Sequence, residues 1–282
     1  MELESIFMIR AGAFGTDFTT KFMMSAVAIA MALWDRYRHG RYDVGIALLF
    51  GTAVWTSAEF FLQRSEAREL AQATLFGFGI PSWVHLPIQG CSEGGAMAAY
   101  AVHFGDRLLH PKSRRRAAMV FAGFLVVIMS KGFAVSAVHP SENVITSVRA
   151  MFTPASMLYV GSMTLLSVVF FRRAKPFQRR RGVAMFAVLI GICSAFTFSQ
   201  FMEEGRWVTI GAEDLYSMPP WPIELLLLAY DIIAEFGAVV FAFFVIPAAL
   251  GWMTTRLPVI EGHVEGHPEG ESCELPNHHH HD

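Results

Sequence analysis

WPIELLLLAYDIIAEFGAVVFAFFVIPAALGW, which runs from Trp221 to Trp252, is apolar and long enough to cross a bilayer, since a membrane helix takes about 20 residues. Within it, Asp231 and Glu235 are four residues apart, so a helix would carry both on one face. That face cannot point at lipid, because a charge in hydrocarbon is costly. The stretch therefore predicts a membrane helix with an acidic face turned towards the protein interior.

Apolar blocks of this kind recur along the whole chain. The chain has 282 residues, of which 54% are hydrophobic, a composition typical of a polytopic membrane protein rather than a soluble one. We therefore expect an all-α fold of seven transmembrane helices. Their predicted limits are Phe18–Trp34, Val44–Leu62, Trp83–Phe104, Ala117–Val138, Ala155–Phe171, Gly182–Met202 and Ile223–Leu250.

The charges of the connecting segments predict the orientation. Three short basic segments (35–42, 106–116 and 172–181) and Arg256 together carry 15 Lys and Arg residues, whereas the opposite side carries five. Short loops rich in Lys and Arg stay in the cytoplasm. The N-terminus should therefore lie outside and the C-terminus in the cytoplasm of a cell whose plasma (inner) membrane holds the chain. Membrane lipids are its expected surroundings, with anionic lipids near the basic segments.

The chain divides into a transmembrane domain, residues 1–253, and a disordered cytoplasmic tail, residues 254–282, which is polar and rich in Gly and Pro. Six histidines and Cys273 in the tail are a composition that binds Zn, Ni or Cu weakly. A solvated tail, or the remnant of a purification tag, explains the same residues without a metal. The three cysteines are far apart and indicate no disulfide framework.

A weak internal repeat is also visible. Ile9-Arg10-Ala11 precedes the first span, and Val148-Arg149-Ala150 precedes the fifth, 139 residues later. On nearly the same offset, Glu93 of the third span corresponds to Asp231 of the seventh. Three helices, a linking fourth and three more in the same orientation would make a 3+1+3 parallel repeat, an arrangement found in some carriers.

Four carboxylates are the candidates of interest within the predicted spans, and all lie in the outer half. Asp231 and Glu235 belong to the seventh span, Glu93 lies at a comparable depth in the third, and Glu59 is close to the outer end of the second. The inner half shows no comparable set, so the simplest explanation is an acidic pocket that opens outward among at least five helices. Because neighbouring carboxylates out of water cannot all ionise easily, we expect some to be neutral acids at pH 7 unless Lys131 pairs with one.

Three kinds of role fit such a set of acids. A neutral acid beside an ionised one is the arrangement that general acid–base catalysis uses. Proton-coupled carriers use the same groups. A buried ion-pair or hydrogen-bonded cluster that fixes the register of the helices would need no further function.

Aromatic side chains close to these acids indicate what a pocket would bind. Phe198 and Phe201 of the sixth span and Tyr230 of the seventh would line a site for an apolar ligand, together with Trp55, which lies one turn before Glu59. Ring faces beside a strong acid would stabilise carbocations. The sequence shows no Gly-rich phosphate loop, aspartate-rich diphosphate motif or nucleic-acid patch. We therefore expect no cofactor, no metal in the transmembrane domain and no nucleic acid.

The seventh span resembles the last helix of microbial rhodopsins, in which an Asp is followed four residues later by the retinal-binding Lys. Here Asp231-Ile-Ile-Ala234-Glu235-Phe-Gly237 has the Asp, but Glu235 occupies the Lys position. The resemblance implies a seven-helix opsin relative with its N-terminus outside. It also implies that no retinal Schiff base forms.

The second predicted span is similar to the corresponding helix of the transmembrane terpene cyclases, which are also seven-helical. Those enzymes protonate an epoxide or alkene with a Glu near the end of this helix and an Asp in the last helix. YDVGIALLFGTAVWTSAEF, from Tyr42 to Phe60, would place the Glu at Glu59, and the Asp would be Asp231. The Trp that directly precedes the Glu in that family is replaced by Trp55, one turn earlier.

These features favour acid-catalysed cyclisation or isomerisation of a lipophilic, terpenoid-like small molecule. Asp231 or Glu59 would donate the proton, and Glu93 and Glu235 would set the acidity of the donor. A non-enzymatic opsin-like sensor or a proton-linked carrier is the main alternative, and a helical subunit of a larger membrane complex is another. The sequence leaves the oligomeric state open.

Overall fold

The computed structural model describes residues 6–11, 16–138, 145–202, 206–210, 216–217 and 219–254. Over these residues the protein is mostly helical (77%), with seven helices. Each of the seven predicted apolar blocks coincides with one of these helices to within a few residues at most ends. The tail predicted for residues 254–282 lies outside the described residues, apart from Thr254.

Five of the seven helices are continuous α-helices, and two change type along their length. The third helix is α4, η2 and α5 in succession, and the seventh is α9, η3 and α10, where η marks a π-helical segment. The bounds are α2 (Thr19–His39), α3 (Asp43–Arg64), α4 (Ser82–Gln89), η2 (Gly90–Ala96), α5 (Met97–Leu109), α6 (Arg114–Val138), α7 (Pro154–Arg173), α8 (Pro176–Met202), α9 (Trp221–Ala229), η3 (Tyr230–Ala238) and α10 (Val239–Ala249).

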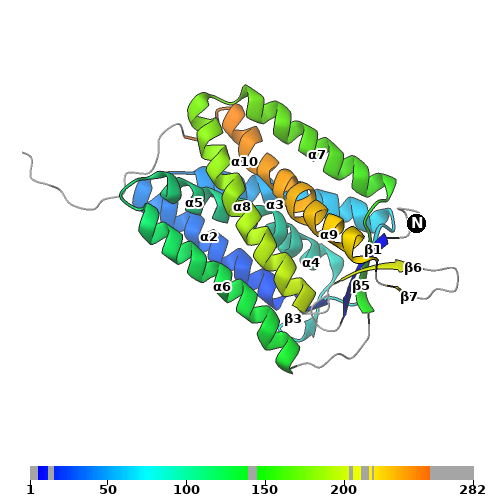
Figure 1. Ribbon diagram of the computed structural model, residues 1–282. Coiled ribbons are helices and arrows are strands. Elements are labelled where there is room, and N and C mark those ends of the chain that lie inside the picture. Colours follow the sequence, from blue (N-terminus) through cyan, green and yellow to red (C-terminus); the bar gives the residue numbers. More distant parts are fainter. Residues whose placement is uncertain are drawn as a thin grey trace, which may run out of the picture.

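Four of the helices are long and apolar enough to cross a membrane, judged by length and composition over the described residues. They are α3, α7, the part of α8 from Pro176 to Ser199, and the seventh helix from Trp221 to Ala249. Such helices indicate a membrane protein. The seventh helix is the most enclosed of the four, with 72% of its apolar window buried, whereas α7 has 22% and lies at the edge of the bundle (Figure 1).

A small antiparallel sheet closes one end of the bundle, which we call the sheet end (Figure 1). It contains β1 (Ile6–Ala11), β2 (Arg68–Leu70), β5 (Ile145–Ala150), β6 (Arg206–Ile210) and β7 (Tyr216–Ser217), in the spatial order β2-β5-β1-β6-β7. A separate hairpin pairs β3 (Thr74–Leu75) with β4 (Phe78–Gly79). The sequence analysis expected these segments to be loops, so the fold departs from an all-α structure here.

Apolar residues fasten the sheet to the helices. Ile6 and Met8 of β1 are buried against Met151 and Leu227, the latter on α9. Because side chains alternate between the two faces of a strand, residues 6 and 8 share one face. This small apolar cluster therefore packs β1 of the sheet against α9 of the bundle.

Some spacings between elements are close to the 139-residue offset of the repeat expected from the sequence. β1 begins at Ile6 and β5 at Ile145, 139 residues later, and these two strands are antiparallel neighbours in the sheet. β6 flanks β1 as β2 flanks β5. The two π-helical segments begin at Gly90 and Tyr230, 140 residues apart.

Candidate functional site

Three of the four candidate carboxylates lie on the two π-helical segments. Glu93 belongs to η2, and Asp231 and Glu235 belong to η3. Asp231 and Glu235 are buried, with 0% and 1% of their surface exposed. π-helical segments inside α-helices are rare and occur frequently at functional sites. The sequence places these acids in helices but does not reveal the π-helical geometry.

Glycines allow η2 to lie directly against α3. A Cβ atom on Gly94 would be 2.5 Å from the Cβ of Trp55, and one on Gly95 would be 2.3 Å from the hydroxyl oxygen of Thr52. Neither distance leaves room for a side chain. Small residues at helix contacts let two backbones approach closely in membrane proteins. The glycines thus bring Glu93 next to the helix that carries Glu59.

Two arginines from the sheet enter the bundle and pair with two of the acids. Arg68 of β2 and Arg149 of β5 are directly opposite each other in the sheet, and both are buried. Like charges in that position repel unless each is compensated. Arg68 Nη1 donates to Glu59 Oε1 at 2.5 Å, and Arg149 forms an ion pair with Glu235.

The other two acids have partners from the helices. Lys21 of α2 forms an ion pair with Glu93 at 2.9 Å, and the side-chain amide of Gln89 donates to Glu93 at 3.3 Å. The hydroxyl of Thr197 on α8 donates to Asp231 Oδ2 at 2.8 Å. Three cations among the described residues, Lys21, Arg68 and Arg149, thus form ion pairs with these acids. The sequence analysis named none of the three as a partner.

The four carboxylates form one site around Arg149. Burial acts to lower the pKa of this guanidinium, but the carboxylates of Glu235, Glu59, Asp231 and Glu93 outweigh it, and the pKa is raised above its ordinary value. Arg149 therefore stays charged at any physiological pH. Two arginines of the sheet, which the sequence analysis did not place at the site, therefore meet the acids that it expected there.

Aromatic rings line the cluster on the side of α3. The indole of Trp55 stacks on Phe236 with 5.4 Å between ring centroids, and Tyr159 of α7 meets its edge at 6.4 Å. Tyr159 interacts electrostatically with Glu59 and Arg149. Its hydroxyl and the Trp55 indole nitrogen are buried without a hydrogen-bond partner among the residues that the structure describes. Buried polar atoms of this kind call for a partner such as water or a ligand.

The structure gathers only part of the predicted aromatic pocket. Trp55 belongs to the cluster, and Tyr230 interacts electrostatically with Glu235 and Arg149. Phe198, in contrast, is 37% exposed, whereas its neighbour Thr197 is buried. The side chains of Lys131 and Phe201 are outside the described part of the chain.

A second buried charge cluster lies at the opposite end of the bundle, which we call the basic end because the short basic connections are there. Arg181 of α8 is fully buried; it donates to Asp106 at 2.6 and 2.8 Å and to Asp43 at 2.6 Å. Arg41 donates to the same two carboxylates, at 2.6 Å to Asp106 and 2.9 Å to Asp43. Arg41, Asp43, Asp106 and Arg181 all lie just outside the predicted spans, so a search for charges within the spans did not find this cluster.

The same cluster fastens the residues after the last helix. The amide of Thr254 donates to Asp43 Oδ1 at 3.0 Å, and its carbonyl accepts from Gln178 at 2.8 Å and from Arg181 at 3.0 Å. Sequence reasoning missed this network because Arg41 and Arg181 were counted among the basic residues that set the orientation. A basic residue can contribute to the excess of Lys and Arg on the cytoplasmic side and still be buried, provided that acidic side chains pair with it.

No group of three or more His, Cys, Asp or Glu side chains in the described residues is arranged to hold a metal ion. The histidines of the tail lie outside those residues. In comparisons with known proteins, no family model, no curated protein and no solved structure matches the chain.

Proposed function

We propose that the chain is a seven-helix protein of the plasma (inner) membrane, with its N-terminus outside and its C-terminus in the cytoplasm. Four helices are already long and apolar enough to cross a bilayer. The short connections 40–42, 110–113 and 174–175 are flanked by most of the basic residues and lie at the same end of the bundle. The sheet end would then face outward, and the charge cluster around Arg149 would lie in the outer half of the membrane.

For the chemistry, we propose acid-catalysed cyclisation or isomerisation of a lipophilic, terpenoid-like substrate, with Asp231 as the proton donor. The observation that carries this proposal is the placement of Asp231. It is fully buried on the π-helical segment η3, and its Oδ2 accepts a hydrogen bond from the hydroxyl of Thr197 at 2.8 Å. Such segments occur frequently at functional sites. Glu59, the other donor that the sequence suggested, is the anionic partner of Arg68, so we assign the role of proton donor to Asp231.

The proposed reaction is a proton transfer with no net oxidation or reduction. Asp231 gives its proton either to an alkene carbon, which takes it with the π electron pair, or to an epoxide oxygen, which takes it with a lone pair while a C–O bond breaks. The resulting carbocation is attacked by the π pair of a second alkene, which forms a ring bond, or it rearranges by a shift. A neighbouring carbon then loses a proton to another carboxylate, and the electron pair of that C–H bond becomes the new double bond. The carboxylate releases the proton to solvent, and solvent returns one to Asp231. The faces of Trp55 and Phe236 would stabilise the intermediate cation.

Gas chromatography coupled to mass spectrometry, which separates isomers of identical mass, tests this proposal on the lipophilic molecules that co-purify with the protein. Wild-type protein should carry a cyclised or rearranged molecule, and Asp231→Asn should carry an isomer of identical mass that has not reacted. Glu69→Gln is a matched control, because Glu69 is an exposed carboxylate on β2. The proposal is wrong if neither form carries a lipophilic molecule, or if Asp231→Asn carries the same isomer as the wild type.

A proton-linked carrier is the second candidate, and the matching spacings of β1 with β5 and of η2 with η3 favour it. They support a 3+1+3 parallel repeat, and carriers move such halves against each other. The charge cluster around Arg149 would then close the outer side of the carrier, and the cluster around Arg181 would close the inner side, in alternation. Uptake of protons into liposomes that hold the protein, driven by a pH gradient and lost in Asp231→Asn, would favour this candidate over the enzyme.

Two other functions of the same site can be tested with the same variant. An opsin-like sensor would use the pocket for a ligand that binds without a Schiff base, since Glu235 pairs with Arg149. In a helical subunit of a larger complex, the ion pairs would serve the register of the helices alone. Asp231→Asn would then change neither a bound molecule nor proton uptake.

A further inference from the structure

The exposed charges of the basic end are all positive among the residues that the structure describes. The acids of this end have at most 1% of their surface exposed; they are Asp35, Asp43 and Asp106. The exposed Lys and Arg residues come from three segments, which we together call the basic surface: 36–38 at the end of α2, 112–116 at the start of α6, and 172–180 where α7 is followed by α8. Burial thus places the negative charges inside and leaves the positive charges outside.

The buried acids have cationic partners of their own inside the bundle. Asp43 and Asp106 accept hydrogen bonds from the two buried arginines of the cluster described above, and Asp35 forms an ion pair with Arg107 at 3.6 Å. They therefore do not offset the charge of the basic surface. A surface that carries charges of one sign attracts partners of the opposite sign. The basic surface is accordingly suited to an anionic partner.

The last residue that the structure describes is fastened beside the basic surface. Hydrogen bonds with α3 and α8 hold Thr254, and one of them comes from Arg181, which donates to its carbonyl at 3.0 Å. Arg179 and Arg180, which precede Arg181 on α8, are exposed and belong to the basic surface. The part of the chain that follows Thr254 therefore begins next to these arginines.

Residues 255–282, which we call the acidic segment, carry the opposite charge. They contain six carboxylates and a single Lys or Arg residue, Arg256. Five of the carboxylates are glutamates between Glu261 and Glu274, ahead of the four consecutive histidines that begin at His278, so they do not belong to a histidine tag. Acidic tails frequently act as interaction segments. The chain thus supplies a partner with the charge that the basic surface attracts.

The attachment point lets the acidic segment reach the basic surface. Glu261 is seven positions after Thr254, and a chain of that length spans at most about 25 Å. α6 and α7 both pack against α8, and the axes of packed helices are about 8–10 Å apart. The basic segments of these helices are therefore within reach of the glutamates. Because the acidic segment is tethered, its effective concentration at this surface is of millimolar order, so weak attraction is sufficient.

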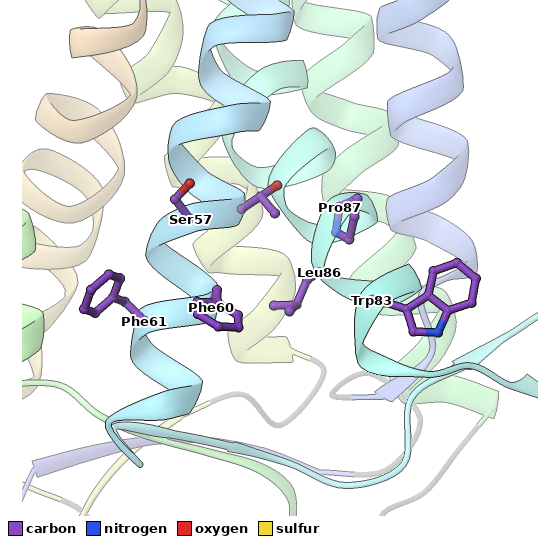
Figure 2. A pocket seen from close by; sticks show the side chains of 7 residues that line it. Ser57, Phe60, Phe61, Trp83, Leu86 and Pro87 are labelled. Carbon is purple, nitrogen blue, oxygen red and sulfur yellow. The ribbon is translucent and has the colours of Figure 1, made fainter.

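A groove between α3 and α4 is a different kind of surface. It is lined by Thr56, Ser57, Phe60 and Phe61 of α3 and by Trp83, Leu86 and Pro87 of α4, none of which is charged (Figure 2). Carboxylates in such a groove would lose water without gaining a counter-ion, which is costly. The charge of the acidic segment therefore favours the basic surface over this groove.

We propose that the acidic segment binds the basic surface of its own chain, with the glutamates between Glu261 and Glu274 against the Lys and Arg residues of α6, α7 and α8. The bound segment covers charges that would otherwise attract anionic lipid head groups. This inference goes beyond the proposed reaction. It depends neither on Asp231 nor on the direction in which the chain crosses the membrane.

The test is zero-length crosslinking of the full chain in phosphatidylcholine nanodiscs with a water-soluble carbodiimide. The carbodiimide activates a carboxylate, and a lysine amine in contact with it displaces the activating group as a urea and forms an amide. Lys112 and Lys175 are exposed lysines of the basic surface. Peptide mass spectrometry should find them joined to glutamates of the acidic segment. Salt should lower the yield at least about fivefold between about 0.1 M and 1 M, because the Debye length falls from about 10 to about 3 Å.

Variants of exposed arginines keep the fold and both lysines. Arg179→Gln combined with Arg180→Gln removes two charges from the basic surface and should lower the yield at least about threefold. Arg64→Gln is the control, because Arg64 is exposed at the end of α3 that lies towards the sheet, and it should leave the yield unchanged. Asp231→Asn should also give the wild-type links, so this proposal and the proposed reaction fail separately.

Three results would overturn the proposal. The first is the absence of links between the acidic segment and Lys112 or Lys175, or a yield that neither salt nor the double arginine variant lowers. The second is links that join only copies of different isotope content when labelled and unlabelled protein are mixed, since the partner is then a second copy. The third is loss of the links in nanodiscs of one part phosphatidylglycerol to four parts phosphatidylcholine, which would assign the basic surface to anionic lipid.

Discussion

Arg149 and Glu235 show at the scale of single residues how the sheet and the helices depend on each other. The arginine comes from β5 and the acid from η3, and both are buried. Removing one partner of a buried ion pair leaves the other charge uncompensated, which is strongly destabilising. Removing both leaves no such charge. The pair is therefore suited to a test that separates a structural role from a catalytic one.

We expect Arg149→Gln and Glu235→Gln each to destabilise the protein by about 3–5 kcal/mol. The double variant should be less destabilised than the sum of the two, because neither charge is then left alone. Thermal unfolding in detergent, followed by circular dichroism, measures all three. Strictly additive effects would contradict a direct ion pair between these residues.

At the scale of elements, the contact between η2 and α3 depends on glycines that have no room for a side chain. We expect Gly94→Ala to lower the thermal stability, because its methyl group would meet the backbone oxygen of Gly51 at 2.6 Å as well as Trp55. Gly123→Ala is the matched control in α6: nothing lies within 4 Å of its added Cβ, and alanine favours a helix by about 1 kcal/mol over glycine. Equal melting temperatures for the two variants would refute the close contact.

The helices are predictable from the sequence, whereas the sheet is not. Each helix contains a long apolar block, as Ile223–Leu250 illustrates. The strands of the sheet have two to six residues and lie in segments that read as loops. Glu59, Asp231 and Glu235, which are buried, and Glu93, which is half-buried, were recognisable as acids within the helices from their positions in the apolar blocks. Their partners were not, because the positions of Arg68 and Arg149 depend on a sheet that forms only in the folded chain.

At the scale of the whole molecule, the cluster around Arg181 ties α3, α5, α8 and the residues after α10 together at the basic end. We expect Arg181→Met to destabilise the protein by about 3–5 kcal/mol, because Asp43 and Asp106 would keep only Arg41 as a counter-ion. Arg180→Met is the matched control, since Arg180 is the preceding residue and is exposed. The same unfolding measurement compares them, and equal losses would show that the network contributes little.

The central claim is that Asp231 gives a proton to a lipophilic molecule. Its most direct test is to incubate the purified protein in deuterium oxide with the unreacted isomer recovered from Asp231→Asn, and to measure the mass of the product. If the proton goes to an alkene carbon, the wild-type product should carry one carbon-bound deuterium that does not wash out, and Asp231→Asn should form at least 100-fold less of it. A product that forms at the wild-type rate in Asp231→Asn would contradict the account.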